Sequence, residues 1–557
     1  MPELPLTIAE AAEALRARRV SSVELTRALL ARADEVDPLI AAYLTRFDEA
    51  ALARAQAADE QLARGEDHGP LHGVPLAVKD IVAAAEGPTT ANSVVLDRAW
   101  GAGRDAPVVR RLRDAGAVIV GKTSTMEFAI GIADPAKPFP VPRNPWDVER
   151  WPGGSSTGTA SGTAAGLFYG GIGTDTGGSI RIPAAFCGVT GLLPTFGRVP
   201  KAGCVPVAWS LDRVGPLARS AEDCALMLEA IAGFDASDES CSRRPVDAYR
   251  PDAAADLTGV RIGVLRDLVE IEGADPALGG CFADALAALE ARGATLHDIA
   301  LPYYGETTIA LLVALVSEPL AYHRNDLGPH WEDYFPGTRT SVALGALFSA
   351  ADYVQAQRVR RVAQRKLAAL FAEVDAIACP TAAVGAPRLD ALDPKRLIDL
   401  AAYINTGYWA ATGNPALSMP IGRTAQGGLP LAIQLAARPF EEALLCRIGH
   451  AYQSQTDWHR ALAQPRAGGG AADGAAVAAT EPAPASTAPD AAPSPHLAAV
   501  RDRLAVAGLE PTPADLASLV EQYPQYVAGV ASLFAIPETR YESSALIFDP
   551  APPFADW

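Results

Sequence analysis

The sequence has few cysteines, and they follow none of the patterns that would give them a structural or metal-binding role. Its seven cysteines are scattered, odd in number and never arranged as a CxxC pair. Disulfide frameworks and cysteine-rich zinc sites both need paired, regularly spaced cysteines, so the sequence excludes both. The pattern is typical of a protein that works in the reducing cytoplasm.

Long apolar runs and a cleavable leader are also missing. The apolar run at residues 309–316 is far shorter than the roughly 20 residues that span a bilayer. Residues 1–37 lack the basic start and apolar stretch of a signal peptide, and their periodicity predicts two amphipathic helices instead. We therefore expect a cytoplasmic protein without a membrane partner.

Positive charge is scarce, which excludes another class of partner. The chain has 47 Lys plus Arg against 65 Asp plus Glu, a formal net charge of −18. A field of this sign repels nucleic acid and anionic membranes. We therefore expect no nucleic-acid partner, and we expect a small-molecule substrate.

Motifs for metals and nucleotides are absent as well. His323 and His330 lie seven residues apart, without an HExxH motif or a third ligand at a fixed offset, so we expect no metal. The glycine clusters fit neither GxxxxGK[ST] nor a strand-bound GxGxxG, and we expect no cofactor. The two histidines instead suggest that residues 316–358, rich in Tyr, His and Trp, either form part of a substrate wall or pack as an ordinary helical layer.

Composition divides the chain into three parts. Residues 466–494 are almost wholly Ala, Gly, Pro, Ser and Thr, which predicts a disordered linker. It separates a body, residues 1–465, from a small C-terminal module, residues 495–557. In the body, short apolar runs at 75–78, 117–120, 261–264 and 376–378 alternate with helical stretches such as 221–232 and 276–292, which favours an α/β fold around a mixed or largely parallel sheet.

A glycine-rich stretch around Ser179, GIGTDTGGSIR, carries the first chemical signal. Consecutive glycines let a backbone approach a substrate closely and turn its N–H groups toward it. Thr176, Gly177, Gly178 and Ser179 are therefore candidates for an oxyanion hole, with the Ser179 hydroxyl as nucleophile. A serine hydroxyl needs a neighbouring base.

A second cluster, PGGSSTG, and an isolated lysine supply candidates for that base. Ser155 or Ser156 can relay a proton, and Lys79 can accept it if burial lowers its pKa enough to keep the amine neutral. Lys79 ends the apolar run 74–78, so burial is plausible. The alternatives are that both clusters are turns or an anion-binding nest, and that Lys79 is a surface lysine ending a strand.

Together these three elements resemble the amidase signature family, the Ser-cisSer-Lys amidohydrolases. The family's motifs are met in order by GVPLAVKD (73–80), GGSSTG (153–158) and GTDTGGSIRIPAAFCG (173–188), and the resemblance covers most of residues 5–462. It implies a central mixed β-sheet covered by helices on both faces, and an amidase that cleaves linear amides through an acyl-enzyme.

The resemblance also implies roles for single residues. Ser179 is then the acyl-forming nucleophile, Ser155 the bridging serine after a cis peptide bond, and Lys79 the general base. Asp175, Arg181 and Ser156 are supporting residues, and Thr157 departs from the glycine more usual after GGSS. Cys187 is best explained as a small buried residue.

Other activities within the family stay open. In glutaminase A subunits of tRNA-dependent amidotransferases, a basic pair before xxLG helps to hold the amino acid's carboxylate. This chain has Thr340 and Ser341 there, with Arg339 one step away. Biuret- or allophanate-type and carbamate hydrolases are further alternatives, as is a non-catalytic subunit that needs a partner.

The C-terminal module resembles the small C subunit of amidotransferases or the helper subunit of carboxybiuret hydrolase; the alternative is an unrelated helical appendage. We expect a short helical hairpin, with a capped helix that opens at Thr512 or Pro513 and has Asp515 in its first turn. An extended tail would dock apolar side chains on the body (Phe548, Pro550, Phe554 and Trp557). Whether it docks in cis or in trans, whether the protein is a homodimer, and the acyl and amine parts of the substrate do not follow from the sequence.

Overall fold

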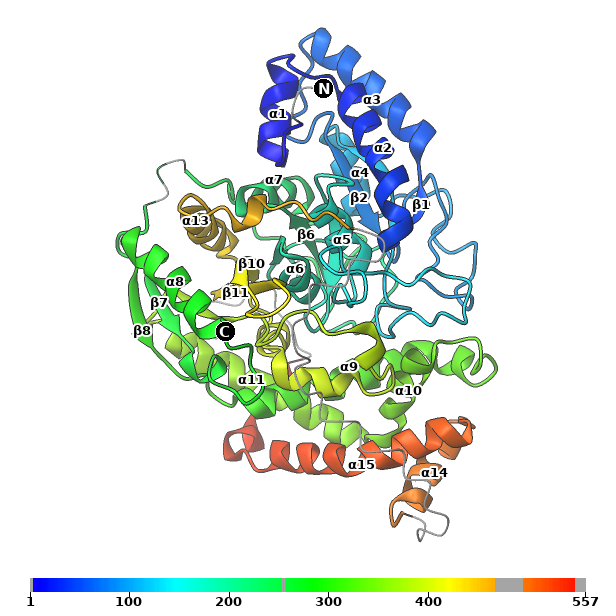
Figure 1. Ribbon diagram of the computed structural model, residues 1–557. Coiled ribbons are helices and arrows are strands. Elements are labelled where there is room, and N and C mark those ends of the chain that lie inside the picture. The colour runs from blue at the N-terminus through cyan, green and yellow to red at the C-terminus, as the bar shows by residue number, and fades with distance from the viewer. Residues whose placement is uncertain (1–3, 253, 255, 466–493, 546–557) are drawn as a thin grey trace.

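The computed structural model describes residues 4–252, 254, 256–465 and 494–545, and these fold around one mixed sheet of 11 strands (Figure 1). In sheet order the strands are β1 (Tyr43–Arg46), β3 (Val118–Thr123), β2 (Pro75–Lys79), β4 (Gly170–Asp175), β6 (Arg213–Ala218), β5 (Thr190–Leu193), β10 (Ala416–Arg423), β11 (Pro430–Ala437), β9 (Ala376–Pro380), β7 (Arg261–Val264) and β8 (Thr295–Asp298).

The sheet contains two parallel patches joined by antiparallel strands. Strand β2 runs parallel to both β3 and β4, and β7 runs parallel to both β8 and β9. Four of these strands coincide with the apolar runs at 75–78, 117–120, 261–264 and 376–378, so those strand predictions are confirmed. The α/β prediction with a mixed sheet is confirmed too.

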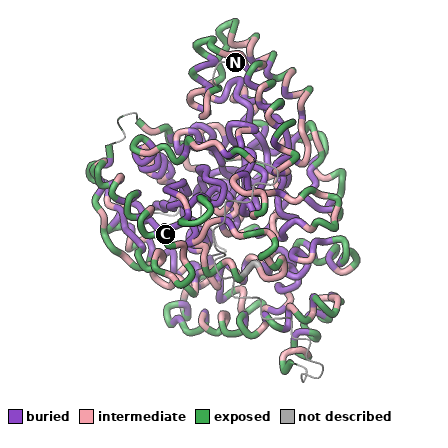
Figure 2. The backbone as a smooth tube through the Cα atoms, viewed as in Figure 1, coloured by how far each residue is buried: buried purple, intermediate pink, exposed green. Residues whose placement is uncertain are grey.

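Helices cover both faces of the sheet. Leu217 and Ala218 are consecutive in β6 and therefore point to opposite faces. Leu217 packs in a cluster with residues from α5 and α6, whereas Ala218 packs with residues from α7. Figure 2 shows the result, a buried centre wrapped by helices with exposed outer sides. The helices are α1 (Ile8–Arg16), α2 (Ser22–Ile40), α3 (Asp48–Ala63), α4 (Pro107–Asp114), α5 (Thr157–Ala165), α6 (Arg181–Cys187), α7 (Ala221–Ile231), α8 (Leu278–Ala291), α9 (Tyr304–Leu327), α10 (Pro336–Leu344), α11 (Ala350–Leu370), α12 (Gly407–Thr412), α13 (Glu442–Gln453), α14 (Leu497–Val506) and α15 (Pro513–Phe534).

Local sequence signals account for several helix starts. Helices α1, α2, α7 and α11 each begin with a capping box, in which a Ser or Thr side chain and a Glu or Asp three residues later bond each other's backbone N–H. The two N-terminal helices and the helices expected at 221–232 and 276–292 are confirmed as α1, α2, α7 and α8.

The C-terminal helices α14 and α15 lie against the body, and Figure 1 shows α15 beside α9, α10 and α11. Thr512 is the N-cap of α15, and its hydroxyl accepts a hydrogen bond from the backbone of Asp515 at 3.2 Å, as the sequence predicted. Almost all of the expected linker, and the tail residues Phe548, Pro550, Phe554 and Trp557, lie outside the described residues.

In the parts of the chain that the structure describes, no helix is both long and apolar enough to span a membrane. The same parts contain no group of three or more His, Cys, Asp or Glu side chains that could hold a metal ion.

One buried ion pair links strand β3 to the residue that directly follows β2. Lys122 and Asp80 lie 3.0 Å apart, with 0% and 1% of their side chains exposed. Asp80 also accepts hydrogen bonds from the backbone and hydroxyl of Thr90. Removing one member of a buried pair leaves a charge without compensation, which costs about 3–5 kcal/mol.

We therefore expect Asp80→Ala to lower the urea concentration at which half of the protein unfolds by an amount that corresponds to about 3 kcal/mol or more. Glu13→Ala is the control, because its pair with Arg19 is largely exposed and worth about 0–1 kcal/mol. Equal urea midpoints for the two variants would contradict this interpretation of the pair.

Candidate active site

The parallel strands β2 and β4 bring Lys79 together with the serine loop. Lys79 is the last residue of β2 and is fully buried. Its Nζ donates hydrogen bonds to Ser155 Oγ at 2.7 Å and to Thr174 Oγ1, from β4, at 2.8 Å. Two of the sequence-predicted residues are thus in direct contact, and the surface-lysine alternative for Lys79 is wrong.

Burial changes the protonation of Lys79. It lowers the pKa of the amine to about 7, because a charged ammonium loses its hydration inside the protein. The negative charges of Asp175 and Asp212 oppose this effect and favour the ammonium. At neutral pH a substantial fraction of Lys79 is therefore the free amine, the form that can accept a proton.

The backbone around Ser155 and Ser156 is held from several sides. The peptide bond between Gly154 and Ser155 is cis, as the family resemblance implied. The Ser155 carbonyl accepts hydrogen bonds from the Thr125 hydroxyl at 2.9 Å and from the Met126 backbone at 3.2 Å. Ser156 donates its backbone N–H to the Ser179 carbonyl at 3.1 Å, which ties the two serine clusters together.

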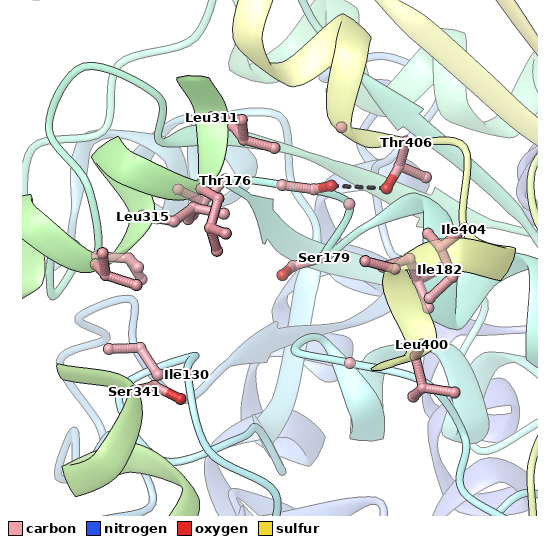
Figure 3. Close-up of a pocket in the computed structure, with 18 of the residues that line it drawn as sticks. Ile130, Thr176, Ser179, Ile182, Leu311, Leu315, Ser341, Leu400, Ile404 and Thr406 are labelled. Atoms are coloured by element: carbon pink, nitrogen blue, oxygen red, sulfur yellow. Dashed lines mark hydrogen bonds between the residues drawn. The ribbon is translucent and has the colours of Figure 1, made fainter. Parts of the chain in front are cut away.

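The glycine loop lies between β4 and α6. Within the described residues, no acceptor takes a hydrogen bond from the backbone N–H groups of residues 176–179, so these donors are available to a ligand. Gly178 has a φ of +152°, and a Cβ there would come within 2.3 Å of the Thr406 hydroxyl. That hydroxyl donates to the Gly177 carbonyl at 2.6 Å (Figure 3). Only glycine allows this close approach.

Asp175 and Arg181 flank the loop and are fully buried. Arg181 donates two hydrogen bonds to the Asp175 carboxylate, at 2.9 and 3.0 Å, and others to the Thr406 carbonyl and the Gln434 amide. Asp175 also accepts the Ile180 backbone N–H at 3.2 Å. Burial raises the pKa of Asp175, but Arg181 and Arg213 outweigh it and lower the pKa overall. The pair thus fixes both ends of the loop.

Ser179 opens into a cavity of about 280 Å³. In Figure 3 its hydroxyl points into the space between Leu311 and Leu315 on one side and Leu400 and Ile404 on the other. Thr176, Gly177, Gly178 and Gly154 also line this cavity. The sequence-predicted nucleophile and oxyanion-hole residues therefore share one wall of a mainly apolar pocket.

Neither His323 nor His330 is among the residues that line this cavity. Helix α9 ends at Leu327, so the two residues do not share a helical face. His323 is buried against Tyr334, and His330 is exposed beside Asp333. From the expected wall at 316–358, the residues that line the cavity are aliphatic or small (Val316, Ser341 and Leu344).

At the position where amidotransferase A subunits carry a basic pair, Thr340 and the neighbouring Arg339 of this chain bind other protein groups. Thr340 donates its hydroxyl to the Pro336 carbonyl at 2.7 Å, within its own helix. Arg339 bonds to Asp515 of α15 at 3.0 Å. Cys187 is buried, and burial raises the pKa of its thiol well above the usual range, in keeping with the structural interpretation.

Sequence reasoning missed several residues of the site. Thr174 lies inside the glycine motif, so the motif itself was a usable signal, but its contact with Lys79 joins residues 95 positions apart in sequence. Thr406 and Gln434 are more than 200 residues away in sequence from the loop that they hold, so no local pattern points to them. The same is true of Gln522 and Tyr526 of α15, which line the cavity.

A comparison with known proteins gives a consistent result. The family model described as Amidase matches residues 24–446. The chain is similar to the A subunit of the glutamyl-tRNA(Gln) amidotransferase of Methylococcus capsulatus, 41% identical over 480 residues, which cover 81% of this chain and 97% of that protein.

Solved structures agree in fold. The peptide amidase of Stenotrophomonas maltophilia is 30% identical with a TM-score of 0.69, covering 84% of this chain and 99% of that one. A chain from a vestigial protein complex, described as revealing the evolutionary origins of an s-triazine catabolic enzyme, is 33% identical with a TM-score of 0.75, covering 83% and 100%.

The buried ion pair between Asp175 and Arg181 should contribute to the stability of the protein. A lysine in place of Arg181 keeps the charge but loses the two-pronged contact, so Arg181→Lys should destabilise the protein by about 2 kcal/mol or more in urea unfolding. The matched control is Arg250→Lys, whose pair with Glu222 is exposed and should lose about 0.5 kcal/mol or less. The interpretation fails if both variants unfold at the same urea concentration.

Proposed function

Because this chain belongs to the amidase family and is an enzyme that acts on carbon–nitrogen bonds, we propose that it hydrolyses a small carboxamide through an acyl-enzyme on Ser179. The observation that carries the proposal is the buried contact of 2.7 Å between Lys79 and Ser155, with a Lys79 pKa of about 7. A base of this pKa is matched to proton transfer at neutral pH.

Acylation begins when Ser179 Oγ attacks the amide carbon. Its proton passes to Ser155 Oγ as the Ser155 proton passes to the neutral Lys79 amine. The carbonyl oxygen becomes an oxyanion that accepts hydrogen bonds from the free backbone N–H groups of residues 176–179. When the C–N bond breaks, the leaving nitrogen takes the proton back along the same relay, and an ester on Ser179 remains.

Deacylation runs the relay a second time. Water attacks the ester carbon and gives a proton to the Ser155–Lys79 pair, and the same backbone donors hold the new oxyanion. The C–O bond to Ser179 then breaks, and Ser179 recovers its proton. In this scheme Asp175, Arg181 and Ser156 are positioning residues, because their contacts hold the loops and do not reach the reacting atoms.

The cavity favours a neutral substrate with an apolar acyl group. Its described lining is dominated by aliphatic side chains (Ile130, Ile182, Leu311, Leu312, Leu315, Leu400 and Ile404). Within that lining Lys395 is the one charged side chain, and its amine lies 2.7 Å from the Asp515 carboxylate. A substrate carboxylate would therefore find no free cation there, and burying it unpaired is costly.

Glutamine hydrolysis is the second candidate, because of the 41% identity to the A subunit of an amidotransferase. The contact of Lys395 with Asp515 opposes it, since the one charged side chain of the described lining is already paired. Arg339, beside the position of the amidotransferase basic pair, is also paired with Asp515. Biuret-type substrates and carbamates are neutral at the reacting group and fit the same cavity chemistry as carboxamides.

We propose that the C-terminal module works in cis as part of this enzyme. Besides the contacts of Asp515, the Gln355 amide donates to the Leu533 carbonyl and the Thr539 hydroxyl, and the Arg503 guanidinium donates to the Leu347 carbonyl.

The cysteines of the described structure are free thiols, which supports a reducing compartment such as the cytoplasm.

The proposal predicts turnover of neutral amides by the purified chain alone. The panel contains aliphatic amides, anilides, carbamates, biuret derivatives, asparagine and glutamine. Ser179→Ala, Ser155→Ala and Lys79→Met should each lower kcat/KM by about 10³-fold or more, because each removes a member of the relay. The exposed serine control, Ser237→Ala, should keep the wild-type value.

Either of two results would count against the proposal. Full activity of Ser179→Ala would exclude Ser179 as the nucleophile. Turnover of glutamine without turnover of neutral amides would favour a function as the glutaminase subunit of an amidotransferase over hydrolysis of a neutral carboxamide.

The protonation of Lys79 predicts the pH dependence. Since the neutral amine is the active form, kcat/KM should fall below a pKa of about 7 as Lys79 gains a proton. Asp212 raises the pKa of Lys79, so Asp212→Asn should move this acid limb to lower pH. Asp298→Asn removes the same charge from β8, at the far end of the sheet, and should leave the limb in place. A shift to higher pH in Asp212→Asn would contradict the assignment.

A further inference from the structure

Helix α15 lies directly behind the cavity. It packs on α9, whose Thr308, Leu311 and Leu315 line the pocket. The two helices approach closely, since a Cβ on Gly529 would lie 3.1 Å from the Ile309 side chain. Helix α15 lies outside residues 24–446, the range that the family model matches.

A buried carboxylate anchors the first turn of α15. Asp515 is fully buried, and its oxygens lie 3.0 Å from Arg339 Nε, 2.7 Å from Lys395 Nζ and 3.0 Å from Trp331 Nε1. Burial raises the pKa of Asp515, but the bonds from Lys395, Thr512 and Trp331 outweigh it, so the pKa is lowered and the group is ionised. The Asp515 carboxylate thus pairs with two cations of the body. These contacts fix the position of the first turn of α15 on the body.

The same face of the helix reaches the pocket. Gln522 and Tyr526 follow Asp515 at seven and eleven residues, a helical spacing, and both line the cavity that Ser179 opens into. Gln522 is 2% exposed and Tyr526 7% exposed. The Tyr526 hydroxyl donates to the Gln522 amide oxygen at 3.2 Å, and the Gln522 amide nitrogen donates to the Ser518 carbonyl at 3.1 Å. These bonds fix both side chains in the cavity wall.

We infer that α15 is a wall of the substrate pocket, and that Gln522 and Tyr526 limit the length of the acyl group that Ser179 accepts. Asp515 is the positioning residue, because it sets α15 against Arg339 and Lys395. This inference rests on the proposed function of Ser179 as nucleophile. It gives the C-terminal module a role in substrate choice within the same chain.

Labelling with alkyl phosphonofluoridates tests the inference without a known substrate. Ser179 Oγ forms a bond to phosphorus, the P–F bond breaks, fluoride leaves, and the serine proton passes through Ser155 to Lys79. Intact-mass spectrometry of the full chain gives the labelling rate with an ethyl and a dodecyl probe, and peptide mapping locates the label. The readout is the ratio of the dodecyl rate to the ethyl rate.

The variants should change this ratio in opposite directions. Tyr526→Ala lengthens the cavity and should raise the ratio about 10-fold, the scale of discrimination by an apolar pocket wall. Tyr526→Trp shortens the cavity and should lower the ratio. The matched control is Tyr523→Ala, on the same helix but outside the cavity lining, and it should keep the ratio within about twofold. Asp515→Asn should also raise the ratio, because it weakens the contacts that hold the first turn of α15 against Arg339 and Lys395.

The outcomes separate the two proposals. Labelling of Ser179 with the same ratio in wild type, Tyr526→Ala and Tyr526→Trp would overturn the pocket-wall inference and leave the nucleophile intact. A wild-type chain that is not labelled, or is labelled at another residue, would overturn the proposed function. If Tyr526→Ala fails to fold, Tyr526→Trp decides: a lower ratio supports the inference, and an unchanged ratio overturns it.

Discussion

The complete burial of the Lys79 amine is the constraint on which the site depends. An ammonium in water has no tendency to lose its proton at neutral pH, whereas burial at the end of β2 lowers the pKa to about 7. The surroundings limit the free-energy cost of burying the amine, because Ser155 and Thr174 accept hydrogen bonds from it and Asp175 supplies a compensating charge. Asp175 is itself paired with Arg181, which also holds the glycine loop. One chain of contacts therefore sets both the base and the oxyanion donors.

Much of the body could be predicted from the sequence, because its signals are local. Apolar runs such as 75–78 predicted strands, and the glycine clusters marked the loops beside Lys79. Contacts across long stretches of sequence could not be predicted. Thr406 and Gln434 hold the glycine loop from the other half of the chain. They lie close to the loop only because of the order of the strands in the sheet, which the sequence does not give. From residues 316–358 it is Val316, Ser341 and Leu344 that line the cavity, not the aromatic residues and histidines that marked this region in the sequence.

The C-terminal helices illustrate a second limit. The start of α15 at Thr512 was readable from its capping residues, but the partners of Asp515 were not, because Arg339, Lys395 and Trp331 come from three separate segments of the body. The same carboxylate pairs Lys395, the charged side chain of the described cavity lining, as well as Arg339. Charge pairing inside the chain therefore supports the proposed preference for a neutral substrate.

The most direct test is the titration of Lys79 by NMR in protein labelled with lysine carrying ¹³C at the ε-carbon. The chain has only six lysines, and Lys79→Met identifies the signal. We expect the Lys79 signal to titrate near pH 7, and to do so in Ser179→Ala as well. A Lys79 signal that titrates near the ordinary lysine pKa of about 10.4 would mean that the amine is protonated at neutral pH, and would contradict its role as the base.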